Sequence, residues 1–424
     1  MTQDFPRTDT SGADIPGADI PGNRLGPRTA VRARTVLPLS RETPARGWEA
    51  LTAPLEVIDN GVIVAANGRI LAVEPYADYC RRADALPPEK IHDLGDVTLT
   101  PGLINCHTHL ELSWMGGKIA PGLGFPAWLS RLIALDRQQS HASDEHNGKA
   151  LAALQNALRR MRETGTALAG DITSRIPETV LQTGAACDVA LRSFLEVIGH
   201  DRATPENMAA RAGANTAFSL AGHALYSTPG ESFLTAKAWC DERNLPFSMH
   251  LAEHEDETEC LFGHGRFYEM LRAAIIPAAW TPPKMRPVPY AAKLGLLRKG
   301  TVAVHCVTCD DTDIKTLALS EVAVCLCPRS NAFINVGEAP ARTLAQRGAL
   351  LTLGTDSLAS NHDLSLWAEA EYFLQKNLLP ANALLRMATV NGAAALGFSQ
   401  GFGRLARNTR FCYTVFPNET FDVE

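Results

Sequence analysis

The chain has 424 residues, of which 46% are hydrophobic and 20% are charged, and its formal net charge is −6. This length exceeds one compact core of ordinary size, so we expect two units, or one large barrel with an appendage. The charge balance and the lack of a long basic run exclude a nucleic-acid groove or an anionic membrane surface as the expected partner.

The N-terminal segment, residues 1–30, is polar and rich in Gly and Pro, and it repeats Ala-Asp-Ile-Pro-Gly at 13–17 and 18–22. We expect it to be a disordered tail without a function of its own. It lacks the apolar core of a secretory signal, and no stretch of the chain approaches the roughly 20 apolar residues of a membrane span. The ten scattered cysteines resemble reduced thiols more than a disulfide framework, so we expect a cytoplasmic protein.

Short strand-like runs follow the tail. The turn signals at 59–61 (Asp-Asn-Gly) and 67–68 (Asn-Gly) separate them. A strand-like run also occurs near the other end of the chain. We therefore expect residues 31–96 and 399–424 to pair into one small β-sandwich that flanks a central domain.

The central domain, residues 97–398, alternates strand-like and helix-like segments, with helical patterns at 151–165 and 232–244. Eight strands that alternate with helices predict an α/β fold, the parallel (β/α)8 or TIM barrel. One connection, residues 256–300, is long enough to be a lid over a site or a structural insertion. The apolar runs lie near 98–106, 166–173, 188–198, 217–223, 246–252, 301–307, 321–327 and 350–355.

Potential metal ligands stand at the ends of four of these runs: His107 and His109 at the first, His250 at the fifth, His305 at the sixth and Asp356 at the eighth. Strand ends converge at the mouth of such a barrel, so these residues would meet there. Side chains of a strand repeat with period two, so His107 and His109 point to one face and form a chelate. A third histidine and a carboxylate complete a site for one divalent metal ion, Zn²⁺ or alternatively Fe²⁺, with a position left for water.

A single histidine at a strand end is more often a hydrogen-bonded core residue than a ligand. The joint pattern decides between the two interpretations. The chain has 12 histidines, and four of them fall at predicted strand ends in barrel order.

The motifs PGLINCHTHL (101–110), HLAE, VAVHCV, CPRSNA and LGTDSLASN together resemble the amidohydrolase superfamily, in its branch of mononuclear deaminases and chlorohydrolases. The resemblance covers about residues 55–400. No lysine ends the fourth strand, 217–224, to bridge a second metal. The resemblance therefore implies one metal ion, with the ligands His107, His109, His250 and Asp356.

Catalytic roles also follow from the resemblance. Glu253 matches the proton shuttle of the family, and His305 matches the histidine that polarises the attacking water or steadies the leaving group. Asp356 is expected to help accept or orient the proton of that water. The implied reaction is hydrolytic deamination, in which water attacks a ring carbon that carries an amino group while Glu253 protonates the adjacent ring nitrogen. The alternative for Glu253 is a solvated carboxylate among acidic neighbours.

The segment around Glu111 and Trp128 resembles a subgroup of bacterial aminohydrolases that deaminate 6-amino-6-deoxyfutalosine, a step of menaquinone biosynthesis. The subgroup's fourth-strand histidine is kept as His223, although both prolines of that motif are replaced. We expect His223 to donate to a purine nitrogen, Arg329 to pair with a substrate carboxylate, and Glu111 and Trp128 to contact the substrate. The structural alternatives are a strand-end histidine, a structural arginine and a cap on the barrel.

The expected function is therefore deamination of an aminopurine nucleoside, with 6-amino-6-deoxyfutalosine as the first candidate substrate. The alternatives are deamination of guanine, adenosylhomocysteine or cytosine, dechlorination of a triazine, and hydrolysis of an imidazolone, because all share the metal ligands. A non-catalytic binding protein on the same fold is a further alternative. The expected partner is a small molecule, and a homodimer is compatible with the family although no patch of the sequence is diagnostic.

Overall fold

The computed structural model describes residues 28–139, 144–199, 204–274, 276 and 280–421. The first strand, β1, begins at Thr29, so the predicted tail lies outside the described residues except for its last three positions. Within the described part, no helix combines the length and the apolar character needed to cross a membrane.

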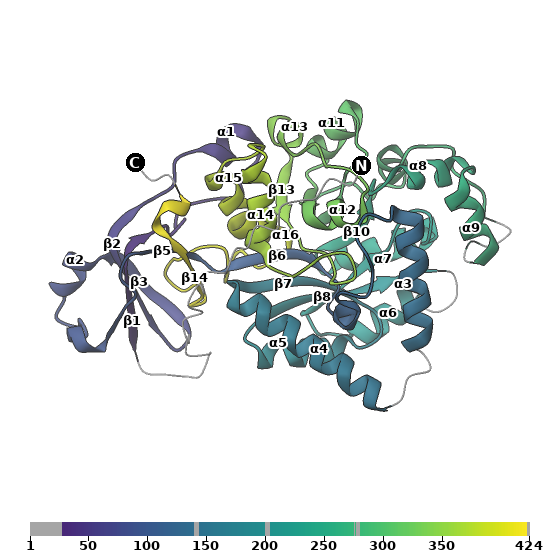
Figure 1. Ribbon diagram of the computed structural model, residues 1–424. Coiled ribbons are helices and arrows are strands. Elements are labelled where there is room, and N and C mark those ends of the chain that lie inside the picture. The colour runs from purple at the N-terminus through teal and green to yellow at the C-terminus, as the bar shows by residue number, and fades with distance from the viewer. Residues whose placement is uncertain (1–27, 140–143, 200–203, 275, 277–279, 422–424) are drawn as a thin grey trace, which may run out of the picture.

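Eight parallel strands form the larger sheet, in the order β13-β12-β11-β10-β9-β8-β7-β6. The sheet closes where the residues after β13 meet β6: the amides of Thr355 and Asp356 each donate to the His107 carbonyl oxygen at 3.0 Å. The predicted TIM barrel is thus confirmed (Figure 1). Its strands are β6 (Leu103–Thr108), β7 (Thr166–Thr173), β8 (Ala190–Val197), β9 (Phe218–Gly222), β10 (Phe247–Leu251), β11 (Thr301–His305), β12 (Ala323–Leu326) and β13 (Leu350–Leu353).

The barrel strands are apolar because both of their faces are covered, by the barrel interior on one side and by helices on the other. In β8, Phe194 packs with Ile172 of β7 and Val304 of β11, whereas Leu195 and Val197 join the cluster beneath the outer helices. Successive residues of one strand therefore face opposite sides of the sheet. This alternation decides which side chains can reach the mouth of the barrel.

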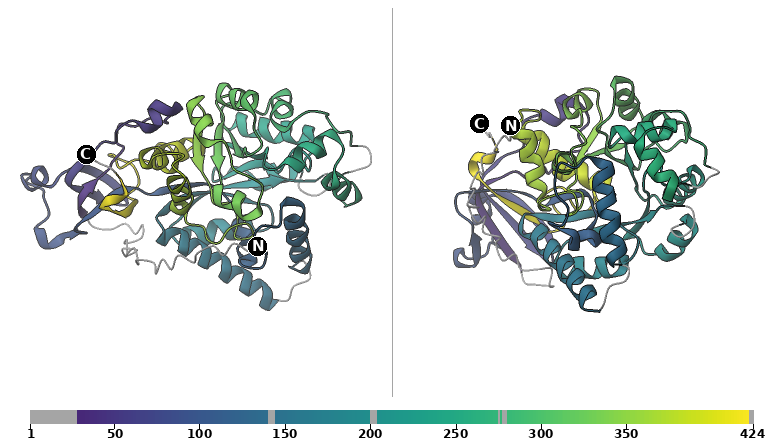
Figure 2. Two further views of the ribbon diagram at one scale, coloured as in Figure 1. Left: turned by 45° about the horizontal axis from the view of Figure 1, so that its top comes forward. Right: turned by 45° about the vertical axis from the view of Figure 1, so that its right-hand side comes forward.

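Helices connect the strands, and most of them lie around the barrel (Figures 1 and 2). They are α1 (Gly47–Thr52), α2 (Tyr76–Cys80), α3 (Phe125–Gln139), α4 (Asp144–Glu163), α5 (Pro177–Ala186), α6 (Pro205–Ala212), α7 (Gly230–Glu242), α8 (Glu255–Phe262), α9 (Arg266–Ala274), α10 (Pro287–Lys293), α11 (Asp311–Leu319), α12 (Pro328–Ile334), α13 (Ala341–Gln346), α14 (Leu366–Gln375), α15 (Ala381–Arg386) and α16 (Gly392–Ala395). The short 3-10 helices are η1 (Pro88–Lys90), η2 (Leu110–Met115) and η4 (Asn418–Thr420), and η3 (Met387–Asn391) is a π-helix.

Both ends of the chain build a second, six-stranded sheet beside the barrel, as expected (Figure 2). Its order is β14-β5-β1-β2-β3, and β4 pairs with β1. The apolar run predicted as the first barrel strand is divided at Gly102: its first half, β5, pairs with β1 and β14, and its second half is β6. The strands are β1 (Thr29–Val36), β2 (Ile58–Ala66), β3 (Arg69–Pro75), β4 (Ile91–Asp93), β5 (Val97–Pro101) and β14 (Tyr413–Pro417).

The long connection between β10 and β11 contains three helices, α8, α9 and α10. Figure 1 shows α8 and α9 at the edge of the barrel. Leu271 of α9 contributes to the wall of the central cavity. The connection is therefore a helical insertion that takes part in the cavity wall.

Arg386 of α15 anchors the segment that leads from β1 to β2. Its buried guanidinium pairs with both carboxylate oxygens of Glu42, at 2.6 and 2.9 Å. The same group donates to the carbonyl oxygens of Leu51, Ala53 and Pro54 at 2.7 to 3.1 Å. One side chain thus donates hydrogen bonds to one carboxylate and three backbone carbonyls of the segment between β1 and β2. This segment has no strand and no long helix.

We expect Arg386→Ala to lower the free energy of unfolding by about 3 kcal/mol, because it leaves a partly buried carboxylate and several carbonyl oxygens unpaired. Urea denaturation measures this change. Arg34→Ala is the matched control, since Arg34 is 71% exposed and lies 3.5 Å from Asp96, and its effect should stay below about 1 kcal/mol. Equal effects of the two substitutions would contradict the anchoring role.

Candidate active site

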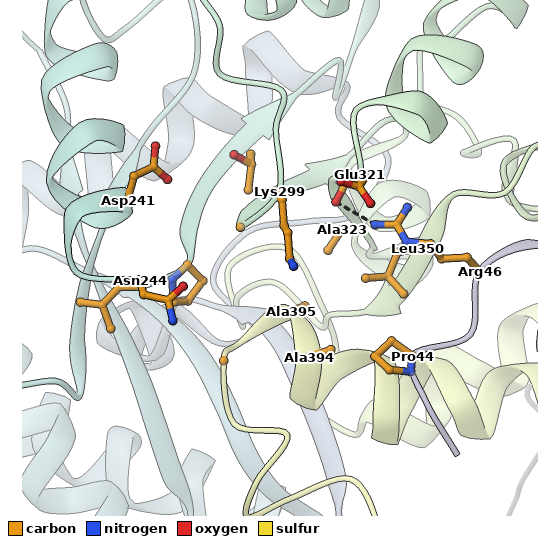
Figure 3. A pocket seen from close by; sticks show the side chains of 15 residues that line it. Pro44, Arg46, Asp241, Asn244, Lys299, Glu321, Ala323, Leu350, Ala394 and Ala395 are labelled. Carbon is orange, nitrogen blue, oxygen red and sulfur yellow. Dashed lines mark hydrogen bonds between the residues drawn. The ribbon is translucent and has the colours of Figure 1, made fainter. Parts of the chain in front are cut away.

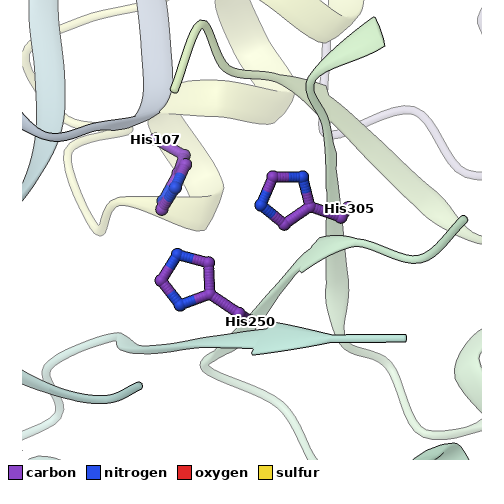
Figure 4. A group of neighbouring side chains, drawn as sticks. All are labelled: His107, His250 and His305. Carbon is purple, nitrogen blue, oxygen red and sulfur yellow. The ribbon is translucent and has the colours of Figure 1, made fainter. Parts of the chain in front are cut away.

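The carboxyl ends of β6, β10, β11 and β13 bring the predicted metal ligands together. His109 Nε2 lies 3.3 Å from His250 Nε2. Asp356 Oδ1 lies 3.7 Å from His107 Nε2 and 3.6 Å from His109 Nε2. Figure 4 shows the rings of His107, His250 and His305 gathered around one point. Residues far apart in the sequence therefore form one cluster of nitrogen and oxygen donors.

This donor set fits a divalent metal ion. Both ring nitrogens of His107 are buried and have no hydrogen-bond partner within the described part of the chain. Burial lowers the pKa of His109 to about 3 and holds the pKa of His250 well below its ordinary value. These imidazoles are therefore neutral, and their lone pairs are available to an ion. Three imidazoles and a carboxylate suit zinc and ferrous iron alike.

The backbone is strained where the strands end at this cluster. Asp356 has a φ of 57°, His305 of 75°, Cys306 of 50° and Ala252 of 52°. Residues other than glycine adopt this left-handed region rarely, and it persists only where the surrounding structure enforces it. With these φ values, the side chains of Asp356 and His305 depart from the regular two-sided alternation of a strand. They do so where they enter the site.

Hydrogen bonds from α12 and from the loop after β13 fix two of these side chains. The hydroxyls of Ser330 and Ser360 donate to Asp356 Oδ2 at 2.7 and 2.8 Å. Asn331 Oδ1 lies 3.0 Å from His305 Nδ1, which leaves His305 Nε2 toward the cavity. Such outer partners set the orientation of a ligand and of an acid–base group. The sequence analysis missed them, although they occupy the CPRSNA and LGTDSLASN motifs.

Glu253 stands beside this cluster as a buried carboxyl group. Its Oε1 lies 3.7 Å from His305 Nε2, and its backbone N–H donates to Glu257 Oε2 at 3.0 Å. Burial, and then the nearby charges of Asp356 and Glu257, raises the pKa of Glu253 well above its ordinary value. A carboxyl group in this environment can carry a proton at neutral pH and deliver it to a bound molecule.

A cavity of about 290 Å³ opens above the cluster. Glu253 and His305 line its floor, and Leu129, Leu132 and Ile133 of α3 line one wall. A concave site with an apolar wall and a few convergent polar groups is typical of a small-molecule site.

Three of the four predicted substrate-binding residues line this cavity, and Trp128 and His223 are two of them. The Trp128 indole Nε1 donates to the Ala359 carbonyl oxygen at 2.9 Å, which fixes the ring as part of the wall. His223 Nδ1 lies 2.5 Å from Ser227 Oγ, so its other nitrogen remains for a ligand. Burial lowers the pKa of His223 to about 4, so its imidazole is neutral.

Glu111 is the third, and its carboxylate is already engaged. Glu111 Oε2 accepts hydrogen bonds from the Thr173 hydroxyl at 2.9 Å and from the amides of Ser174 and Arg175 at 3.3 and 3.1 Å. These bonds hold the loop after β7 at the rim. All three bonds end on Oε2, so the other carboxylate oxygen of Glu111, Oε1, can contact a ligand.

Arg329 is the exception, because the structure does not bring it to the cavity. Its guanidinium pairs with both carboxylate oxygens of Asp363, at 2.7 and 3.0 Å, and its backbone N–H donates to Glu369. The sequence suggested a partner for a substrate carboxylate. An internal carboxylate takes that place, and these contacts fit the structural alternative.

Glu196, at the end of β8, lines the cavity and was not predicted as a site residue. Its Oε1 is buried without a hydrogen-bond partner within the described residues. Burial, followed by the nearby charge of Glu111, raises the pKa of Glu196 to about 8. The available signal in the sequence was a single charged residue near the end of the apolar run 188–198.

A second cavity, of about 560 Å³, lies at the opposite end of the barrel, where the strands begin (Figure 3). Arg46 and Lys299 line it together with Asp241 and Glu321, and Arg46 donates to the Glu321 carbonyl oxygen at 2.8 Å. None of the predicted site residues lines this cavity. The chemistry-bearing groups of the sequence therefore gather at the mouth formed by the carboxyl ends of the strands.

Comparison with known proteins agrees with this geometry. Residues 98–423 match the model of the amidohydrolase family. The 5-methylthioadenosine/S-adenosylhomocysteine deaminase of Nitratidesulfovibrio vulgaris strain Hildenborough is 30% identical over 82% of this chain and 77% of its own length. Among solved structures, the fold is shared with aminofutalosine deaminase of Helicobacter pylori (TM-score 0.75, 21% identity, 92% of each chain) and with a zinc-bound adenosine deaminase of Xanthomonas campestris (TM-score 0.72, 22% identity, 92% of this chain and 84% of that chain).

Proposed function

Because the chain belongs to the amidohydrolase family, we propose that it is a metal-dependent hydrolase that deaminates an aminopurine nucleoside. The observation that carries the proposal is the placement of Glu253. The carboxyl group of Glu253 is buried, which raises its pKa, and its Oε1 lies 3.7 Å from His305 Nε2. It lines the cavity that also contains the histidine and aspartate cluster. A proton donor and a water-activating centre on the same cavity are what hydrolytic deamination of a ring requires.

His107, His109, His250 and Asp356 would hold one divalent ion, either zinc or ferrous iron. When bound, the ion supplies Lewis acidity that lowers the pKa of water at the site. The unpartnered nitrogens of His107 and the neutral state of the other rings support this assignment.

The side chains around the ion divide the proton transfers between them. Asp356, held by Ser330 and Ser360, orients the attacking water and accepts its proton. His305 assists through Nε2, because Asn331 occupies its Nδ1. Glu253 donates a proton to the ring nitrogen beside the reacting carbon, so that the addition of water does not leave a full negative charge on the ring. The proton taken up by Asp356 then passes to the amino group, and ammonia leaves as the carbon–nitrogen bond breaks. The hydroxyl proton on the same carbon returns to Glu253 as the ring carbonyl forms.

The ring is oriented by His223, whose free nitrogen reaches a second ring nitrogen. The apolar wall of Leu129, Leu132 and Ile133 would receive the group attached at the 5′ position of the sugar. The first candidate substrate is 6-amino-6-deoxyfutalosine of menaquinone biosynthesis, since the motifs around Glu111 resemble those of enzymes that use it. Methylthioadenosine and S-adenosylhomocysteine, the substrates named for the Nitratidesulfovibrio relative, carry the same aminopurine ring.

Ammonia release from the zinc- or iron-loaded protein tests the proposal. The panel consists of adenosine, methylthioadenosine, S-adenosylhomocysteine and 6-amino-6-deoxyfutalosine, with guanine and cytosine as competing ring types. We expect turnover of at least one adenine nucleoside with kcat/KM in the ordinary enzyme range, above about 10⁴ M⁻¹s⁻¹. The proposal fails if the metal-loaded protein releases ammonia from none of these nucleosides, or if it instead releases chloride from a chlorotriazine.

A further inference from the structure

Glu196 occupies a position that the proposed reaction does not use. It precedes the last residue of β8 and shares its strand face with Phe194, which packs among neighbouring strands. In register it lies opposite Ala221 of β9, two residues before His223. Its carboxylate oxygen, a nitrogen of His223 and a nitrogen of His250 all lie within 4.8 Å of one another. The carboxyl group therefore lies on the floor of the cavity, next to His223.

Three neighbouring strands present one polar group each along this floor. Glu253 lies two residues after the end of β10, His223 directly follows β9, and Glu196 is the last residue but one of β8. Under the proposed function, Glu253 contacts N1, the ring nitrogen beside the reacting carbon, and His223 contacts a second ring nitrogen. Because β9 is the neighbour of β10, that second nitrogen is the next one along the same edge of the purine, N3. The next group along that edge of a purine nucleoside is the sugar on N9, because a single ring carbon separates N3 from N9. The order of the strands thus aligns Glu196 with the sugar.

The chemistry of the substrate class agrees with this alignment. Glu196 Oε1 has no hydrogen-bond donor among the described residues, and a buried acceptor without a donor is unfavourable. In an adenine nucleoside the ring nitrogens are acceptors, and the one amino group is at the reacting carbon. The hydroxyl groups of the sugar are the remaining donors. The 2′-hydroxyl is the nearest to N3, because its carbon adjoins the glycosidic bond.

We propose that Glu196 accepts a hydrogen bond from the 2′-hydroxyl of the bound nucleoside and makes the enzyme selective for ribonucleosides over 2′-deoxyribonucleosides. This inference rests on the proposed deamination of an aminopurine nucleoside. It adds the identity of the sugar to the substrate class, a feature that the metal ligands and Glu253 do not determine.

The test compares kcat/KM for adenosine, 2′-deoxyadenosine and 3′-deoxyadenosine, measured by ammonia release from metal-loaded enzyme. We expect the wild type to favour adenosine over 2′-deoxyadenosine on the order of 10- to 100-fold, because the deoxy compound leaves Glu196 unpaired. Glu196→Ala should lower kcat/KM for adenosine, leave that for 2′-deoxyadenosine nearly unchanged, and bring their ratio close to one. Glu196→Gln keeps an acceptor oxygen of similar size, so it should retain part of the preference.

Two comparisons separate this role from a general effect on the fold. The ratio of adenosine to 3′-deoxyadenosine should change less than the 2′ ratio in Glu196→Ala. Glu206→Ala removes an exposed carboxylate from α6, the helix that follows β8, and should leave every ratio at the wild-type value.

Equal turnover of adenosine and 2′-deoxyadenosine by the wild type would overturn the inference while the deaminase proposal stands. An unchanged 2′ ratio in Glu196→Ala would overturn it as well. If the metal-loaded wild type deaminates no nucleoside at all, the proposed function fails, and the role of Glu196 fails with it.

Discussion

Replacement of His107 by alanine is expected to remove the bound metal and the ammonia-releasing activity together. His107 is fully buried, and its two ring nitrogens have no other partner in the described structure. Its replacement removes one of four donors and leaves a cavity beside the other three. Since losing even an outer partner of a ligand typically reduces metal affinity or activity by 10- to 100-fold, losing the ligand itself should exceed about 100-fold in both.

Elemental analysis of the purified variant measures the metal, and the ammonia assay measures the activity. His92→Ala serves as the control, because His92 is an exposed histidine on β4 of the smaller sheet. Treatment of the wild type with a chelator should reproduce the loss, and added Zn²⁺ or Fe²⁺ should restore activity. A His107→Ala protein that keeps one equivalent of metal and full activity would refute the assigned ligand set.

Replacement of Glu253 by glutamine should lower kcat by about 10² to 10⁴-fold while the metal content stays at the wild-type value. Glutamine has nearly the same shape, but its amide does not transfer a proton to the ring nitrogen. Burial raises the pKa of Glu253, which favours the protonated acid that the reaction needs. The effect should appear in kcat more than in KM, because the proton is transferred in the transition state.

Glu255→Gln is the matched control for this substitution, since Glu255 is exposed at the start of α8, two residues further along the chain. It should keep both kcat and metal content. A Glu253→Gln enzyme with unchanged kcat would disprove the proton-shuttle role. Loss of metal in the same variant would instead show that Glu253 supports the ligands.

The barrel could be predicted from the sequence because its strands are buried on both faces and appear as uninterrupted apolar runs. The run that became β5 and β6 was predicted as one strand. Its break at Pro101 and Gly102 depends on contacts that no local pattern contains: a Cβ at Gly102 would lie 2.6 Å from Ala167 Cβ. The helices between β10 and β11 escaped prediction because Gly263, Gly265 and several prolines interrupt their apolar periodicity.

The site was predictable to the extent that its residues end strands. His250 and Asp356 could be placed by this rule without any knowledge of their neighbours. Hydrogen-bond and ion-pair partners that are distant in the sequence could not be predicted by this rule. Arg329 looked available in the sequence because Asp363, its actual partner, is distant along the chain and meets it only through the packing of the loops after β12 and β13. Glu196 was overlooked because a lone carboxylate in a strand has no sequence partner to give it a role.

The ring of strands has a seam between β13 and β6, and the donor cluster lies at that seam. Asn105 and Thr355, 250 residues apart, are joined there by a hydrogen bond of 2.7 Å, and His107 and Asp356 follow them on either side. An ion held by both would fasten the first strand of the barrel to the last. Its binding energy would then oppose opening of the ring as well as serve chemistry, since a ligand of the native state raises stability by mass action. Loss of the ion would therefore destabilise the barrel first at the seam between β13 and β6.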